Sequence, residues 1–125
     1  DALGQNARTQ IFVFFQSGDP RSGEAARQVD AFVQQFGKRY GASVLGVNAD
    51  YQGHTAALEF KQRYGISFPV VASRELATSL GVSELPTIAI VAPGAKKAVL
   101  KSGQITAQEL KQIFTEGSSY EASRS

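Results

Sequence analysis

Asp19 and Ser22 stand three positions apart in residues 17–22 (SGDPRS), where an apolar run gives way to polar residues. A carboxylate and a hydroxyl at this spacing could serve acid–base or nucleophilic chemistry. A nucleophilic serine needs an adjacent base, but no histidine base is evident for Ser22 and the chain has no Gly-x-Ser-x-Gly elbow. Because a helix N-terminus favours a negative charge, Asp19 is predicted instead to be an acid in the first turn of a helix.

The composition argues against several other kinds of chemistry. The chain has no cysteine, and the nucleophile of disulfide exchange is a thiolate, so we predict that it is not an enzyme of the dithiol oxidoreductase class. We expect no cofactor and no metal, because Asn48, Asp50 and Glu59 lack the spacing of a calcium loop and no glycine-rich phosphate loop is present. A net charge of +2 is too small to indicate a nucleic-acid partner. A helix that inserts into a membrane needs roughly 18–20 apolar residues, and no apolar run in the chain is that long. We therefore expect no direct insertion into a membrane.

An apolar strand and an amphipathic helix are predicted on either side of the Asp19–Ser22 pair. Residues 9–16 are rich in Val, Ile and Phe without alternation, which indicates a central strand buried on both faces. Its three aromatic residues are predicted to lie in the core, with the lining of a peptide groove as the alternative; they are Phe12, Phe14 and Phe15. Residues 22–40 have a helical apolar face, which consists of Ala25, Ala26, Val29, Phe32, Val33 and Phe36.

The rest of the chain predicts alternating strands and helices. Strands are expected at 42–47, 87–91 and 97–101, and helices at 55–64, 75–80 and after Thr106, which forms a capping box with Glu109. Pro69 argues against an interior strand at 66–71. The order predicts an α/β fold with a central mixed sheet of about four strands and helices on both faces. Residues 1–8 are expected to be a flexible lead-in, 9–116 one domain, and 117–125 a flexible tail.

Pro86 stands at the start of the predicted strand 87–91, directly after Leu85. A proline in this position has a structural meaning, because it cannot donate a hydrogen bond within a sheet. Two interpretations stay open. Pro86 either only shapes the turn before the strand or forms part of a groove that binds peptides.

This arrangement resembles the thioredoxin fold over residues 9–115. In that fold a strand, a short turn and a helix carry Cys-x-x-Cys, and a proline such as Pro86 in Leu85-Pro86-Thr87 is cis and lies beside this turn. The resemblance implies that a bound peptide would pair with the backbone at Pro86. The segment between Val47 and Pro69 is similar to the extra segment of the TlpA-like branch.

The sequences of these motifs are most similar to those of the TraF and TrbB proteins of F-type conjugation and type IV secretion. TrbB-like members carry Cys-Pro-x-Cys after a strand similar to residues 11–16, which aligns their cysteines with Asp19 and Ser22. Some TraF-like members lack these cysteines, as this chain does. The resemblance implies an exported, periplasmic protein that acts in pilus assembly.

The leading hypothesis is therefore a redox-inactive thioredoxin-like scaffold or chaperone-like binding domain in the periplasmic assembly of a conjugative pilus or type IV secretion apparatus. Its partners would be other assembly proteins, and its oligomeric state stays open. The candidate protein-binding residues come from two segments, namely Ser17, Asp19 and Pro20 from the first and Leu85 and Pro86 from the second. The alternative is a fragment of a TlpA- or peroxiredoxin-like thiol-disulfide oxidoreductase whose reactive cysteines lie outside this chain or in a partner.

Overall fold

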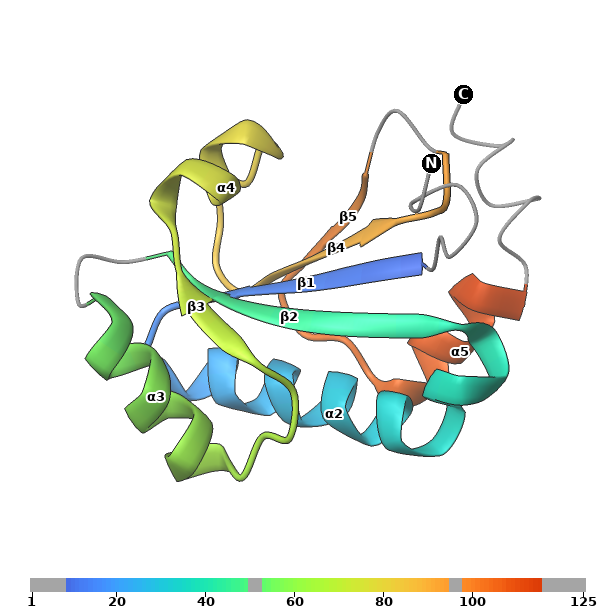
Figure 1. Cartoon of the computed structure of the whole chain (residues 1–125), viewed down its shortest axis with the longest axis horizontal. Coiled ribbons are helices and arrows are strands. Elements are labelled where there is room, and N and C mark those ends of the chain that lie inside the picture. Colours follow the sequence, from blue (N-terminus) through green and yellow to red (C-terminus); the bar gives the residue numbers. More distant parts are fainter. Residues whose placement is uncertain (1–8, 50–52, 95–97, 116–125) are drawn as a thin grey trace.

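The computed structural model describes residues 9–49, 53–94 and 98–115. The predicted lead-in, residues 1–8, and the predicted tail, residues 117–125, lie outside the described residues. The described residues form a central sheet with helices on both of its faces (Figure 1). The predicted α/β fold class is confirmed.

The sheet is mixed and has the strand order β3-β2-β1-β4-β5. Strands β1 and β2 pair in parallel, as do β2 and β3, whereas β4 runs antiparallel to both β1 and β5. The strands are β1 (Thr9–Phe15), β2 (Ala42–Asn48), β3 (Val70–Ala72), β4 (Thr87–Val91) and β5 (Val99–Ser102). The sequence predicted about four strands and missed the short β3. This strand begins directly after Pro69 and lies at the edge of the sheet, where a preceding proline is tolerated.

Three of the helices cover one face of the sheet and the fourth lies on the other (Figure 1). Helices α2, α3 and α5 lie together below the sheet in this view, and the short α4 lies above it. Their bounds are α2 (Pro20–Tyr40), α3 (Gly53–Tyr64), α4 (Arg74–Ser79) and α5 (Ala107–Thr115). All four lie within about two residues of the predicted positions, a usual uncertainty for helix ends.

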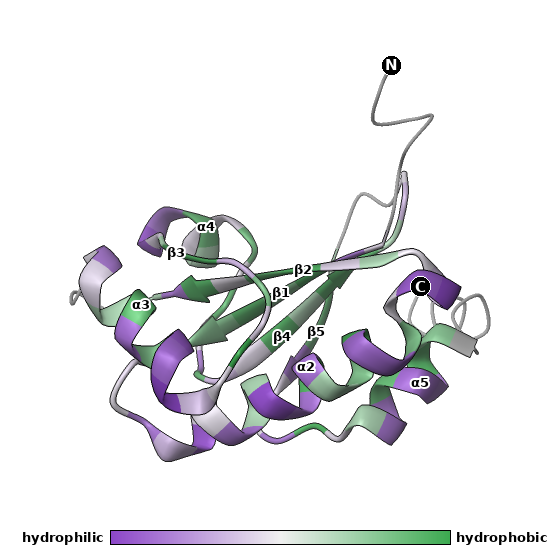
Figure 2. Cartoon of the chain, turned by 60° about the horizontal axis from the view of Figure 1, so that its bottom comes forward, coloured by the Kyte–Doolittle hydropathy of each residue, from purple (hydrophilic) through white to green (hydrophobic). Residues whose placement is uncertain are grey.

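The core has two parts, one on each face of the sheet. The larger part lies against α2, α3 and α5 and includes the fully buried Phe15 and Phe32. The smaller part lies on the α4 face and includes Phe14, which is also fully buried, with Phe12 half-buried beside it. Figure 2 shows hydrophobic residues along the central strands and hydrophilic ones on the outward parts of the helices. Strand β1 is therefore buried on both faces, as its apolar run predicted.

Local sequence signals set several of the helix ends. Helix α2 ends at Gly41, which has a left-handed φ of 61°, a conformation that glycine adopts without steric cost. At the start of α5, Thr106 and Glu109 form the predicted capping box: each backbone N–H donates to the other side chain, at 2.9 and 3.0 Å.

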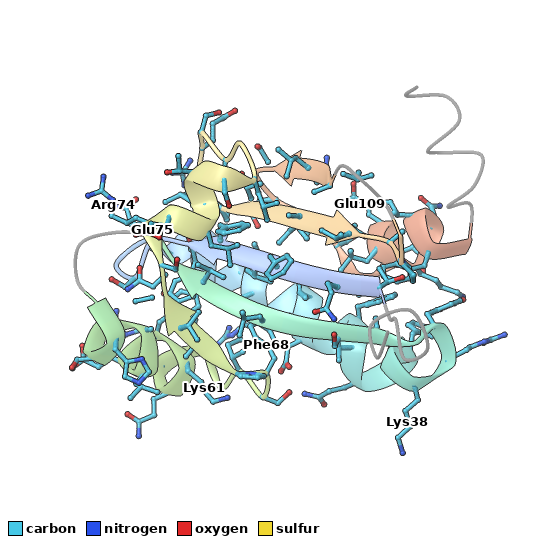
Figure 3. All side chains as sticks on the ribbon, turned by 45° about the horizontal axis from the view of Figure 1, so that its top comes forward. Lys38, Lys61, Phe68, Arg74, Glu75 and Glu109 are labelled. Atoms are coloured by element: carbon cyan, nitrogen blue, oxygen red, sulfur yellow. The ribbon has the colours of Figure 1, made fainter. Side chains whose placement is uncertain are left out.

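Two polar contacts hold α3 and the loop after it against the rest of the fold. The Lys61 ammonium of α3 donates to the carbonyl oxygens of Phe68, at 2.6 Å, and of Ser67, at 3.3 Å (Figure 3). The buried Asp30 carboxylate of α2 accepts hydrogen bonds from the hydroxyl and the backbone N–H of Ser67. These contacts fix α3 beside the N-terminal half of α2, which positions one wall of the candidate site.

Candidate functional site

The two predicted binding segments lie at one end of the central strands, where β1 ends and β4 begins; this end is called the binding edge below. Strand β1 runs antiparallel to β4, and Phe14 near the end of β1 faces Thr87 at the start of β4. The turn that follows β1 therefore lies at the same edge as Leu85 and Pro86, which precede β4. Sequence reasoning placed Ser17, Asp19 and Pro20 with Leu85 and Pro86, and the topology brings these segments to the same edge.

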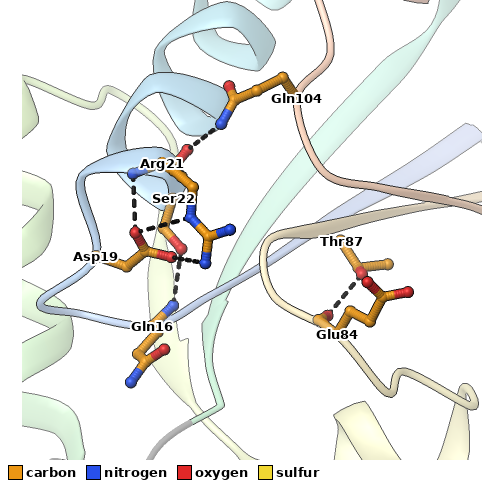
Figure 4. A network of polar contacts seen from close by, with 7 residues as sticks. All are labelled: Gln16, Asp19, Arg21, Ser22, Glu84, Thr87 and Gln104. Atoms are coloured by element: carbon orange, nitrogen blue, oxygen red, sulfur yellow. Dashed lines mark hydrogen bonds and ion pairs between the residues drawn. The ribbon is translucent and has the colours of Figure 1, made fainter.

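Asp19 caps the N-terminus of α2. Its Oδ1 accepts a hydrogen bond from the backbone N–H of Arg21 at 3.0 Å, and Pro20 occupies the first position of the helix. The Arg21 guanidinium folds back onto the same carboxylate, with Nε–Oδ1 at 3.3 Å and Nη2–Oδ2 at 3.2 Å (Figure 4). The Asp19 side chain is 13% exposed, whereas that of Arg21 is 72% exposed. Both carboxylate oxygens are thus engaged within the turn.

Ser22 closes the turn from the inside. Its side chain is fully buried, and its Oγ accepts a hydrogen bond from the backbone N–H of Gln16 at 3.1 Å (Figure 4). The backbone N–H of Asp19 donates to the carbonyl of Gln16 at 3.0 Å. Residue 16 is thereby held on both its N–H and its C=O. This geometry gives Ser22 the role of a structural acceptor, since a nucleophile must reach its substrate.

The Leu85–Pro86 peptide bond is cis, as the resemblance implied. Pro86 is buried, and its carbonyl accepts a hydrogen bond from the backbone N–H of Gly103 at 2.9 Å. The Thr87 hydroxyl donates to the carbonyl of Glu84 at 2.7 Å and lies 3.0 Å from the Ser102 hydroxyl. The segment before β4 is thus anchored to the end of β5, and both interpretations of Pro86 remain compatible with this geometry.

Sequence reasoning missed a cleft next to this turn. The cleft has a volume of about 310 Å³ and lies between the turn after β1 and the side of α3, where Glu59 and Arg63 contribute charged side chains. The i, i+4 spacing of these two residues was visible in the sequence. Nothing in the sequence indicated that α3 would lie against the β1–α2 turn.

Among the described residues, no group of three or more His, Asp or Glu side chains is arranged to hold a metal ion. None of the helices in this part of the chain has both the length and the apolar character that a bilayer span requires.

Solved structures similar to this chain share the thioredoxin fold. StoA from Bacillus subtilis is 22% identical, with a TM-score of 0.72 over 87% of this chain and 83% of its own. A thioredoxin-related protein from Neisseria meningitidis serogroup B is 14% identical, with a TM-score of 0.73 and coverages of 90% and 87%. A secreted Mycobacterium tuberculosis disulfide oxidoreductase is 12% identical, with a TM-score of 0.68 and coverages of 86% and 81%. Identities this low establish the fold alone.

Sequence comparison identifies the family. No curated protein sequence matches the chain. The family described as TraF, F plasmid transfer operon protein, matches residues 2–115, which include the β1–α2 turn and the segment before β4. The chain is therefore a cysteine-free member of the TraF family with a thioredoxin-like fold.

Proposed function

We propose that this chain is a redox-inactive, thioredoxin-like binding domain that acts in the periplasmic assembly of a conjugative pilus or type IV secretion apparatus. Its task would be to hold other assembly proteins, as a scaffold or in the manner of a chaperone. The contact surface is the edge formed by Ser17, Asp19 and Pro20 together with Leu85 and Pro86.

The single observation that carries this proposal is the state of the Asp19–Ser22 pair. Asp19 has both oxygens engaged by Arg21, and Ser22 is fully buried and accepts the Gln16 N–H. Neither side chain can supply the thiolate of disulfide exchange. The turn and the proline segment of the fold are nonetheless both present, which supports binding without redox chemistry.

Membership of a family described by the F plasmid transfer operon supports a role in conjugation. The resemblance to TraF and TrbB proteins supports the periplasm as the compartment in which this domain would act. A thioredoxin-like fold on its own specifies no function, so the site geometry and the family membership are needed together.

The first test concerns redox activity. In the insulin reduction assay with dithiothreitol, this chain should match the no-protein baseline, because it has no thiol. The rate of turbidity increase is measured at equal concentrations of this chain and of an active thioredoxin. A reproducible acceleration by the purified chain would contradict the proposal.

The second test concerns the binding edge. A photo-crosslinking amino acid placed at Pro20, which is exposed at the candidate edge, should crosslink to a pilus-assembly protein in cells that carry the transfer system. The control places the same group at Gln35, also exposed on α2 but about 22 Å further along it. We expect the adduct from position 20 to be several-fold more abundant, as measured by mass spectrometry. Equal yields from both positions, or adducts with no transfer protein, would exclude this edge as the contact surface.

A further inference from the structure

The cleft beside the Asp19–Ser22 turn has defined walls. Its volume of about 310 Å³ is at the lower end of the range for small-molecule pockets, so it accommodates a few side chains. One wall is the turn after β1 and the other is α3, and the two walls together comprise Gln16, Ser17, Gly18, Ala56, Glu59, Phe60 and Arg63. In Figure 4 the Gln16 side chain points away from the Ser22 hydroxyl.

The base of the cleft is closed by a packed aromatic pair, and its turn side is open. Phe60 is 2% exposed, and its ring stacks on Phe15 with the ring centroids 3.9 Å apart. A Cβ added at Gly18 would meet no atom within 4 Å, so the backbone of the turn is open to an approaching chain at this point. A ligand in the cleft therefore lies above a closed base and meets an accessible stretch of backbone at Gly18.

The α3 wall carries two opposite charges that the fold does not use. Glu59 and Arg63 are both exposed. The ion pairs formed within the described residues are Arg21–Asp19 and Lys101–Glu109, so neither Glu59 nor Arg63 is paired there. Both charges are therefore available to a ligand.

The spacing of these charges matches an extended peptide. Four residues of an α-helix rise about 6 Å, which separates Glu59 from Arg63 along α3. Side chains two residues apart in an extended strand lie on the same side, about 6.6–6.8 Å apart. An extended segment that lies along α3 can thus place one side chain opposite each charge.

We propose that the cleft binds an extended polypeptide segment that carries one basic and one acidic side chain two residues apart. The basic side chain lies against Glu59 and the acidic one against Arg63. The segment continues over the Gly18 backbone toward the Leu85–Pro86 edge. This inference rests on the proposed function, and it specifies the chemistry of the partner.

The test uses three blocked heptapeptides, acetyl-Thr-Val-X-Thr-Z-Val-Thr-amide, in which X and Z are Lys and Glu, two Lys, or two Glu. Binding is followed by amide chemical-shift changes of the isotope-labelled chain in low salt. We expect the Lys/Glu peptide to bind the unmodified protein with a Kd on the order of 1 mM. Its preference over the two like-charged peptides should be about three- to tenfold, because exposed charge pairs change binding by modest factors.

Charge reversals should change the preferred peptide. Glu59→Lys leaves two positive charges in the cleft, so the peptide with two Glu should bind best. Arg63→Glu leaves two negative charges, so the peptide with two Lys should bind best. Glu75→Lys on α4 and Lys38→Glu on α2 make the same charge changes at exposed positions that do not line the cleft, and should keep the original order. Circular dichroism verifies that each variant is folded.

The amides that respond separate this inference from the proposed function. Shifts at Gly18 and along α3, with the expected change of preference, support the inference. Shifts confined to Leu85 and Thr87, or a preference that the charge reversals leave unchanged, overturn the inference while the binding edge stands. An absence of shifts at both places overturns the inference, whereas the proposed function is decided by the crosslinking experiment.

Discussion

The double variant Asp19→Cys, Ser22→Cys is expected to form an intramolecular disulfide and to reduce insulin measurably faster than the unmodified chain. Asp19 is the N-cap of α2 and Ser22 lies three residues further on, in the first helical turn. This spacing places the two Cα atoms within the range of about 4.4–6.8 Å that disulfides require. The bond should therefore form without movement of the backbone.

The residues around positions 19 and 22 favour thiol chemistry in some respects and cost stability in another. Removal of the Asp19 carboxylate releases the Arg21 guanidinium, and a positive charge and a helix N-terminus both favour a thiolate. Ser22 is fully buried, so the thiol at position 19 would be the accessible, attacking one. Closing so short a loop should make the oxidised form more stable than the reduced form by about 1–2 kcal/mol. Loss of the Asp19 cap lowers the stability of both forms by about 0.5–2 kcal/mol.

Thiol titration after mild oxidation measures the outcome, followed by the insulin assay. The single variants Asp19→Cys and Ser22→Cys are the matched controls, and neither should accelerate insulin reduction above the baseline. Their thiols should also differ in reactivity, with the buried position 22 reacting much more slowly with a soluble thiol reagent. Two free thiols per chain in the oxidised double variant would mean that positions 19 and 22 do not face each other.

Local signals in the sequence predicted most of the elements around this pair. The apolar run of β1 lacks alternation because both of its faces are buried, Ile11 on one and Phe14 on the other. The N-terminus of α2 was predictable because Asp19 and Pro20 act within the helix's own first turn. The capping box of α5 is equally local. Signals of this kind need no knowledge of the rest of the fold.

Features that depend on distant residues could not be predicted. Gly23 shows why: a Cβ there would lie 2.3 Å from the Tyr64 ring, so glycine allows α2 and α3 to approach closely. Asp30 reaches Ser67 across 37 positions. Strand β3 has only three residues, and it depends on its parallel partner β2 for its definition. Each of these features depends on residues that are distant in the sequence and meet only in the folded structure.

The candidate site also has residues that the sequence identified and contacts that only the folded structure shows. Asp19 and Ser22 were identified from the sequence because their spacing aligns with a family motif. The ion pair of Asp19 with Arg21 and the hydrogen bond from Gln16 depend on the folded turn, and they explain why this pair acts as a structural element. The charged wall formed by Glu59 and Arg63 was not predicted, because the position of α3 against the turn was not.

Phe32→Ala should destabilise the domain by about 3–5 kcal/mol, the usual cost of removing a fully buried aromatic side chain. The Phe32 side chain is fully buried, and its ring centroid lies 5.0 Å from that of Phe114 on α5, 5.6 Å from that of Phe36 and 6.2 Å from that of Tyr40. These rings join α2 to α5 beneath the sheet. Since domains of this size are stable by about 5–15 kcal/mol, the variant should lose a large share of its total stability.

Urea unfolding followed by circular dichroism measures this effect, and Phe36→Ala is the matched control. Phe36 lies on the same helix and contacts Phe32, but it is only half-buried, so its removal should cost about 1–2 kcal/mol. A cost for Phe32→Ala no larger than that for Phe36→Ala would contradict the packing of α2 on α5. If the expected order holds, the aromatic cluster around Phe32 is what secures α2 to α5. The turn at Asp19 is held separately, by the hydrogen bonds that Gln16 makes with Ser22 and Asp19. Binding there therefore needs little ordering of the turn.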